Sequence, residues 1–302
     1  MQETKIDFVI PTLFSKPILL TSCKKSIIIQ KGSFEKKIYV EAGYGFAEGV
    51  NKGIKNGKSP YVAVINDDVK LDENWLKEAH CVLDKNQNCA AVATRVLTYD
   101  GKYIDSCGMD VKREGKAKKR GNGEKKDVQK WNKIEEVFGV PCSAALFKRE
   151  ALEKVKLFDE DFIAYEEDVD ISFRLRSMGY SIFYAPNAVA FHKMHATSDT
   201  FGNFKVRMDA KNWIFIIIKN YPFQFITQFA QDIFIERLRN LIGLINETVH
   251  LYRWKSFWVV PYSLLTTYGN VLRKFRVMMQ KRSEIQRKSV IHYSELIQWM
   301  RN

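Results

Sequence analysis

The chain has 302 residues and a mass of 35.2 kDa, which is enough for one large hydrophobic core or two modest ones. Its content of 46% hydrophobic and 27% charged residues excludes an intrinsically disordered chain. The five cysteines include no C-x-x-C pair, which argues against a zinc or dithiol site and favours a reducing cytoplasm. The first residues show no signal-peptide pattern, so no secretion is expected.

The net charge of +13 is unevenly distributed along the chain. From Asn203 onward there are sixteen Lys and Arg residues against six Asp and Glu, so this last third alone carries +10. In the rest of the chain, positive and negative charges are almost equal in number. A basic region rich in Trp, Tyr and Phe suits anionic lipid or nucleic acid, and composition does not choose between them.

The first part of the chain alternates short apolar runs with helix-like stretches. Residues 8–10, 27–29 and 37–40 are candidate strands, and residues 61–65 predict a buried strand. This alternation predicts an α/β fold with a mostly parallel sheet flanked by helices. The buried strand leads directly into Asn66-Asp67-Asp68, and such sheets bind ligands at the carboxyl ends of their strands.

The alternation of apolar runs and helix-like stretches continues through residue 200. Asp72 is placed to cap a helix with one apolar face. Residues 112–133 are crowded with Lys, Arg and Gly and lack apolar periodicity, which predicts a mobile surface loop. A further helix begins near Asp168, and extended residues 181–191 then lead to His192.

Residues 206–302 have a different sequence pattern, which predicts long helices rich in apolar and aromatic residues and no strands. We therefore predict two regions, a nucleotide-binding domain at 1–205 and a basic helical region at 206–302. The low-charge stretch 256–272 is shorter than the roughly 20 apolar residues that cross a bilayer. Basic residues flank it, which favours a helix lying in the membrane interface or an element of oligomerisation.

Three acidic or imidazole-bearing features are candidates for chemistry. Asn66-Asp67-Asp68 offers oxygen ligands to a hard cation, although Asn and Asp are equally typical of a plain turn. Residues 165–170 place four carboxylates ahead of an amphipathic helix, which suits either catalysis or the helix dipole alone. His192 ends a strand, where a histidine is more often a packed or surface group than a metal ligand.

These features occur together, in order, within a chain that resembles glycosyltransferase family 2, and in particular its rhamnosyltransferase-like branch. The resemblance covers roughly residues 6–220. The motifs that carry it are Phe8-Val-Ile-Pro-Thr12, Gly45-Phe-Ala-Glu-Gly-Val-Asn51, Val64-Ile-Asn-Asp-Asp68, Asp72-x-x-Trp75-Leu76, Ser143-Ala-Ala-Leu-Phe147, Phe158-Asp-Glu-Asp-Phe162, Tyr165-Glu-Glu-Asp-Val-Asp-Ile171, Arg174-Leu-Arg-x-x-Gly-Tyr180 and Ala185-Pro186 leading to His192.

The resemblance implies a GT-A fold, inversion at the anomeric carbon, and a divalent cation, Mn²⁺ or Mg²⁺. It makes Asp168 the general base, with Glu167 beside it, and Asp68 and His192 the metal ligands. The implied donor-binding residues are Pro11, Thr12, Asn51, Asn66, Asp67 and Gln30. The last of these departs from the family, because relatives place an acidic residue after the second strand, where this chain has Gln30.

The sequence thus predicts an inverting hexosyltransferase that moves a sugar, with rhamnose as the first candidate, from a dTDP- or UDP-linked donor. The expected acceptor is a glycan or lipid-linked glycan of a cell-surface polysaccharide. The expected place is the cytoplasm, peripheral on the inner face of the cell membrane, as monomer or homodimer and without nucleic acid. Two alternatives stay open: a nucleic-acid-binding protein that uses the basic C-terminal region, and a non-catalytic subunit that binds sugar nucleotides.

Overall fold

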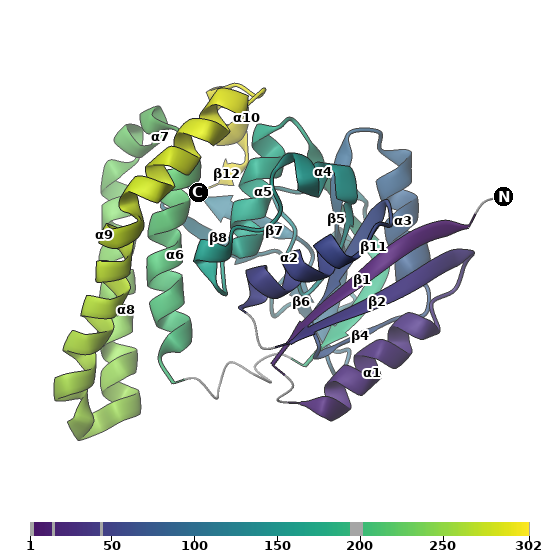
Figure 1. Cartoon of the computed structure of the whole chain (residues 1–302), viewed down its shortest axis with the longest axis horizontal. Helices are drawn as coiled ribbons and strands as arrows, with labels where there is room; N and C mark the ends of the chain where they lie inside the picture. The colour runs from purple at the N-terminus through teal and green to yellow at the C-terminus, as the bar shows by residue number, and fades with distance from the viewer. Residues whose placement is uncertain (1–2, 14–15, 43–44, 194–201, 302) are drawn as a thin grey trace.

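The computed structural model describes residues 3–13, 16–42, 45–193 and 202–301. A central sheet carries helices on both faces, and the C-terminal helices stand together along one side of it (Figure 1). The predicted α/β fold, with a sheet flanked by helices and a helical C-terminal region, is confirmed.

The main sheet has nine strands among the described residues, and seven of them follow the order β2-β1-β3-β10-β5-β11-β4. β1 is parallel to β2 and β3, and β5 is parallel to β11, whereas β10 and β4 run antiparallel to their neighbours. β6 and β9 extend it at β5 and β11. The strand bounds are β1 Thr4–Thr12, β2 Phe34–Ala42, β3 Tyr61–Ile65, β4 Val69–Leu71, β5 Cys89–Thr98, β6 Ile104–Ser106, β9 Glu135–Glu136, β10 Ala144–Lys148 and β11 Ser181–His192.

Helices bury an apolar stripe on each face of this sheet. One face is covered by α2 (Phe46–Asn56), α4 (Arg149–Lys154) and α5 (Glu167–Ser177), and the other by α1 (Pro17–Ile28) and α3 (Trp75–Lys85). α2 approaches β1 so closely that a Cβ on Gly53 would lie 2.4 Å from Val9 Cγ1. Glycine is therefore needed for this helix to pack on the sheet.

The predicted strand at residues 27–29 is wrong, because Ile27 and Ile28 form the last turn of α1. Leu20, Cys23 and Ile27 are the buried apolar positions of that helix, a spacing of three and four that marks one helical face. A run of three apolar residues does not distinguish a helix end from a strand. The second strand of the chain is instead β2.

The predicted loop at 112–133 is also wrong over much of its length. β7 (Met109–Lys112) and β8 (Lys116–Lys119) form a hairpin, and a short 3-10 helix, η1 (Gln129–Trp131), follows. Gly115 turns the hairpin with a φ of +80°. The Arg120 guanidinium lies 5.2 Å from the centre of the Trp131 ring, which is itself buried. Basic side chains on both strands obscure the apolar signal of this small sheet.

The C-terminal region contributes helices α6 (Phe204–Asn220), α7 (Phe223–Gln228), α8 (Ala230–Tyr252), α9 (Ser256–Lys288) and α10 (Tyr293–Gln298). β12 (Met300–Arg301), which was not predicted, pairs with β7. Phe162 and Phe173 share one core with Trp213, Phe215 and Tyr221, so these helices pack directly on the acidic segment and α5. In the described part of the chain, no helix combines the length and the hydrophobicity that crossing a membrane requires.

Candidate active site

The acidic tip, residues 66–68, follows β3 at the edge where the parallel strands β1 and β2 also end. The Asn66 N–H donates to the Ser143 carbonyl at 2.9 Å, and the Thr12 hydroxyl donates to the Asp67 carboxylate. Burial raises the pKa of Asp67, and the Thr12 hydrogen bond counteracts part of that rise. Thr12 and Asp67, two of the predicted donor-binding residues, thus lie in contact.

His192 ends β11 and faces Asp68. β11 pairs antiparallel with β4, with His192 opposite Val69, so the imidazole lies beside the acidic tip. His192 Nε2 lies 3.2 Å from Asp68 Oδ1, and His192 Nδ1 lies 2.9 Å from Asp105 Oδ2. Burial lowers the pKa of His192, but the hydrogen bonds and charges of Asp105 and Asp68 outweigh it and raise that pKa to about 9.

Asp105 and Lys119 belong to the same cluster, and neither was among the residues predicted for the site. Asp105 is fully buried on β6, and Lys119 Nζ donates to its two carboxylate oxygens at 2.9 and 3.1 Å. Lys119 comes from β8, within the segment predicted to be a loop. Neither residue lies in a motif, so no sequence signal pointed to them.

Asp168 and Glu167 open α5, where the helix dipole favours negative charge. Burial and the neighbouring Asp168 raise the pKa of Glu167 to about 8. Burial also raises the pKa of Asp168, while the N–H of Val169, which donates to Asp168 Oδ1 at 2.8 Å, and the charge of Lys119 lower it. Glu167 is therefore mostly protonated near neutral pH.

The segment leading into α5 is strained. Ile163, Tyr165 and Glu166 have φ values of 68°, 66° and 64°, which side chains with a Cβ seldom adopt. The buried Asn212 of α6 lies behind them, and its Nδ2 donates to the carbonyls of Phe162, Ala164 and Tyr165 at 3.0, 2.9 and 2.7 Å. Strain of this kind persists where the surroundings fix it and is concentrated at functional sites.

Hydrogen bonds of two adjacent residues, Cys142 and Ser143, connect Asp168 to the acidic tip. The backbone of Cys142 hydrogen-bonds Asp168, and the carbonyl of the next residue, Ser143, accepts from Asn66. On the other side, the charge of Lys119 acts on Asp168 while its amine binds Asp105. The structure thus gathers the predicted metal and base residues around one site.

Several buried oxygens at this site have no hydrogen-bond partner among the described residues. They are Asn66 Oδ1, Ser143 Oγ and Glu167 Oε2. Buried polar atoms are nearly always paired, so such a group indicates a place for water, an ion or a ligand. Within the described chain no cluster of three or more His, Cys, Asp and Glu side chains is arranged to hold a metal.

A divalent cation nevertheless fits Asp68 and His192. A ligating histidine usually donates its second ring N–H to a carboxylate, which is how His192 contacts Asp105. Mg²⁺ is commonly held by one or two carboxylates together with the phosphates of a substrate. Two protein ligands are therefore enough when a diphosphate supplies the others.

Two predicted donor-binding residues make other contacts. Both ends of the Gln30 amide are engaged: Nε2 donates to the carbonyls of Ser26 and Asp72, and Oε1 accepts from Leu76 N–H at 2.8 Å. Asn51 similarly bonds both backbone groups of Phe158. A donor-binding role for Gln30 and Asn51 stays a prediction that these contacts do not support.

The structure places an acidic residue, Glu41, at the end of the second strand. Once the second strand is placed at β2, Glu41 lies opposite Pro11 in the parallel register, at the carboxyl end of the sheet. Its carboxylate pairs with Lys52 Nζ at 3.1 Å and accepts from Asn56 Nδ2 at 2.9 Å. The apparent departure at Gln30 therefore came from the wrong strand assignment.

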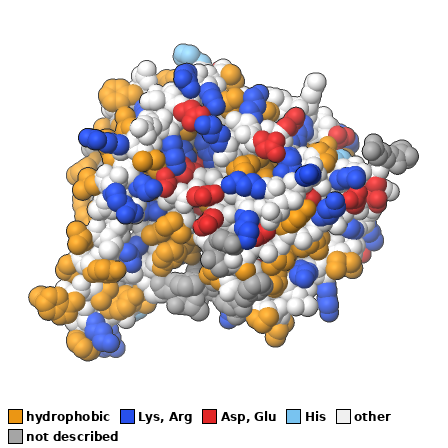
Figure 2. Space-filling view, viewed as in Figure 1, with side chains coloured by type: hydrophobic (Ala, Val, Ile, Leu, Met, Phe, Trp, Pro, Cys, Tyr) orange, Lys and Arg blue, Asp and Glu red, His pale blue; other side chains and the backbone are white. Residues whose placement is uncertain are grey.

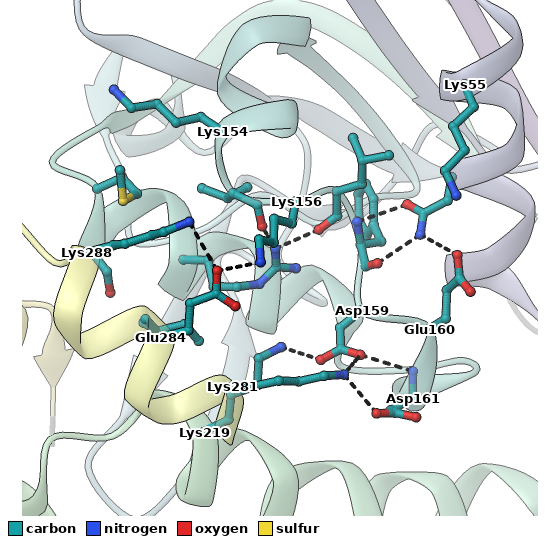
Figure 3. Close-up of a pocket in the computed structure, with 18 residues that line it drawn as sticks. Lys55, Lys154, Lys156, Asp159, Glu160, Asp161, Lys219, Lys281, Glu284 and Lys288 are labelled. Carbon is teal, nitrogen blue, oxygen red and sulfur yellow. Dashed lines mark hydrogen bonds and ion pairs between the residues drawn. The ribbon is translucent and has the colours of Figure 1, made fainter. Parts of the chain in front are cut away.

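A cavity of about 520 Å³ lies elsewhere, between α2, residues 154–161, the end of α5 and α9 (Figure 3). Of the predicted site residues, Asn51 alone lines it. Its wall includes an ion network in which Asp159 binds Lys219 of α6 and Lys281 of α9, at 2.5 Å each (Figure 3). This network connects α6 and α9 to the turn before the acidic segment.

Comparison with models of known protein families identifies the family of this chain. The family model described as glycosyl transferase family group 2 matches residues 62–279, so the chain belongs to that family. The match extends through α6 and most of α9, beyond the boundary predicted at residue 205. No curated protein sequence matches the chain.

Two of the solved structures with a similar fold are glycosyltransferases. One is the mannosyltransferase PcManGT from Pyrobaculum calidifontis in complex with GDP-Man and Mn²⁺, with a TM-score of 0.53 and 14% identity over 94% of this chain and 85% of that chain. Another is GalNAc-T7 with UDP, GalNAc and Mn²⁺, with a TM-score of 0.51 and 11% identity over 71% of this chain and 50% of that one. The predicted GT-A fold is confirmed.

Proposed function

We propose that this glycosyltransferase moves a sugar from a nucleoside-diphosphate donor to a hydroxyl of a glycan or lipid-linked glycan, with inversion at the anomeric carbon. The observation that carries the proposal is the run of contacts from Asp68 through His192 and Asp105 to Lys119, whose positive charge also acts on Asp168. It groups a cation site with a carboxylate whose pKa is raised toward the working range of a base.

In this proposal the Asp168 carboxylate takes the proton of the acceptor hydroxyl. The acceptor oxygen then forms a bond to the anomeric carbon, and the bond from that carbon to the diphosphate oxygen breaks, with its electron pair leaving on the diphosphate. Asp68 and His192 would hold Mn²⁺ or Mg²⁺, which neutralises the charge that develops on the departing diphosphate. Glu167, protonated near neutral pH, limits repulsion beside Asp168.

The identity of the donor belongs to the proposal as well. A dTDP- or UDP-linked sugar is proposed, with dTDP-rhamnose as the first to test, and Pro11, Thr12, Asn66 and Asp67 line its path. Thr12 and Asp67 support this placement because they hydrogen-bond each other at the carboxyl ends of β1 and β3. The enzyme is proposed to act in the cytoplasm, peripherally on the inner face of the cell membrane.

The test is a thermal-shift screen of nucleotide sugars with and without Mn²⁺ or Mg²⁺, followed by measurement of nucleoside diphosphate release. A true donor raises the melting temperature by mass action, and more so with the cation present. Asp68→Asn should remove the cation-dependent part, whereas Asp84→Asn, at an exposed position of α3, should not. If no donor shifts the melting temperature or is turned over, the proposal fails.

A further inference from the structure

The α8–α9 hairpin ends in an uncovered aromatic tip. We define the hairpin tip as residues 249–262, which include the end of α8, the turn η4 (Arg253–Lys255) and the start of α9. Trp254, Phe257 and Trp258 are 81%, 73% and 76% exposed. Hydrophobic side chains gather at this end of the molecule, with Lys and Arg beside them (Figure 2). Such a concentration of exposed apolar surface indicates an interaction site.

The hairpin itself is held firmly, so the tip is a fixed feature of the surface. One face of α9 is buried through Ser263, Thr267, Val271 and Met278, a spacing that follows the helix period. At the tip, the Phe257 and Trp258 rings lie 5.1 Å apart, and no described element covers the exposed side of either.

The charge around the tip selects its partner. Residues 248–283 contain seven Lys and Arg and no Asp or Glu. Among the described residues, no carboxylate forms an ion pair with Arg253 or Lys255 in the tip. Tip-to-tip pairing of two copies would bring these like charges together, whereas an anionic bilayer neutralises them, each cation strengthening binding about fivefold. Trp and Tyr are also the residues enriched where headgroups meet acyl chains.

The hairpin tip and the active site lie on the same side of the molecule. In Figure 1 the turn between α8 and α9 is at the lower left, and the carboxyl ends of β1 and β2 point toward the lower left from the middle of the molecule. The acidic tip at residues 66–68 belongs to that edge of the sheet, because β3 is parallel to β1. A surface that received the hairpin tip would therefore also face the active site.

We infer that the hairpin tip inserts into the headgroup region of an anionic bilayer and so presents a membrane-anchored acceptor to the active site. The docking is by the end of the hairpin, not by the whole length of residues 256–272 lying flat, since one face of that helix is buried. The statement about the acceptor rests on the proposed function, while the insertion does not.

The experiment measures binding to vesicles of phosphatidylcholine alone and of phosphatidylcholine with one third phosphatidylglycerol, by co-sedimentation and tryptophan emission. The full chain should bind the anionic vesicles, less tightly as salt rises, with emission shifted to the blue. The triple variant Trp254→Ser, Phe257→Ser, Trp258→Ser should bind at least about tenfold more weakly. The matched control replaces three exposed apolar residues elsewhere with serine: Ile28, Ile29 and Ile134.

Equal vesicle binding by the wild type and the tip variant would overturn the inference. So would a wild type that ignores vesicles but forms a dimer by light scattering that the tip variant loses, because the tip would then be a self-association surface. Donor turnover with a soluble acceptor separates this from the proposed function: it should be the same in the tip variant and the wild type. Vesicle binding without any donor turnover would uphold the insertion and reject the proposed activity.

Discussion

Replacing Asn212 with alanine tests whether the C-terminal helices shape the active site. The Asn212 amide has two protons and serves three carbonyls of residues 162–165, so its removal leaves buried acceptors unpaired. At about 1 kcal/mol for each hydrogen bond, the free energy of unfolding should fall by about 2 to 3 kcal/mol. The freed segment carries three residues with positive φ immediately before Asp168.

Relaxation of that strain should displace the Asp168 carboxylate. A misplacement near 1 Å is enough to lower a catalysed rate by about 100-fold, so kcat should fall far more than donor affinity. The assay is nucleoside diphosphate release, measured where denaturant curves show the variant to be fully folded.

Asn203→Ala is the matched control for this variant. Asn203 is also buried in the helical region, and its amide donates to Thr248 and Ser263 at 2.8 and 2.9 Å instead of to the carbonyls of residues 162–165. It should lose about 2 kcal/mol of stability and keep its kcat. If both variants lose kcat equally, or if neither does, α6 does not position the base.

Two further predictions concern buried carboxylates near the site. Because the pKa of Glu167 rises from 4.5 to about 8 on folding, its contribution to stability is present below pH 4.5 and is lost as pH rises toward 8. Glu167→Gln should therefore show a smaller fall in the free energy of unfolding than the wild type between these values, and parallel curves would contradict the assignment. Asp105→Asn should weaken Mn²⁺ protection against thermal unfolding by about 10- to 100-fold in cation concentration, because His192 loses its anionic partner. Asp100→Asn, on an exposed turn, should not, and equal effects would mean that Asp105 does not orient the imidazole.

Much of the fold could be predicted from local patterns. The strand before Asn66, the helix after Asp168 and the strand ending at His192 were each marked by apolar periodicity, and each is confirmed. The failures have a common cause, which is that local pattern is ambiguous where few residues are apolar or the pairing is long-range. At residues 27–29 a helix end resembled a strand, and at β7–β8 charged side chains concealed a hairpin.

The active site, too, could be predicted only in part from the sequence. The resemblance pointed to Asp68, Asp168 and His192, which the structure gathers together. It could not point to Asp105, whose role depends on the position that a short buried strand takes against β5, or to Asn212, which lies 48 residues after its hydrogen-bond partner Ala164. Residues that hold a site in place through tertiary contacts leave no mark in a motif.

The proposed mechanism depends most on Asp168 acting as the general base beside a cation-bound donor. The direct measurement compares wild type and Asp168→Asn, by donor turnover and by titration of donor binding in the presence of Mn²⁺. The account predicts a fall in turnover of about 100- to 10,000-fold with donor affinity nearly unchanged. Turnover that survives the substitution, or donor binding that is lost together with turnover, would contradict it.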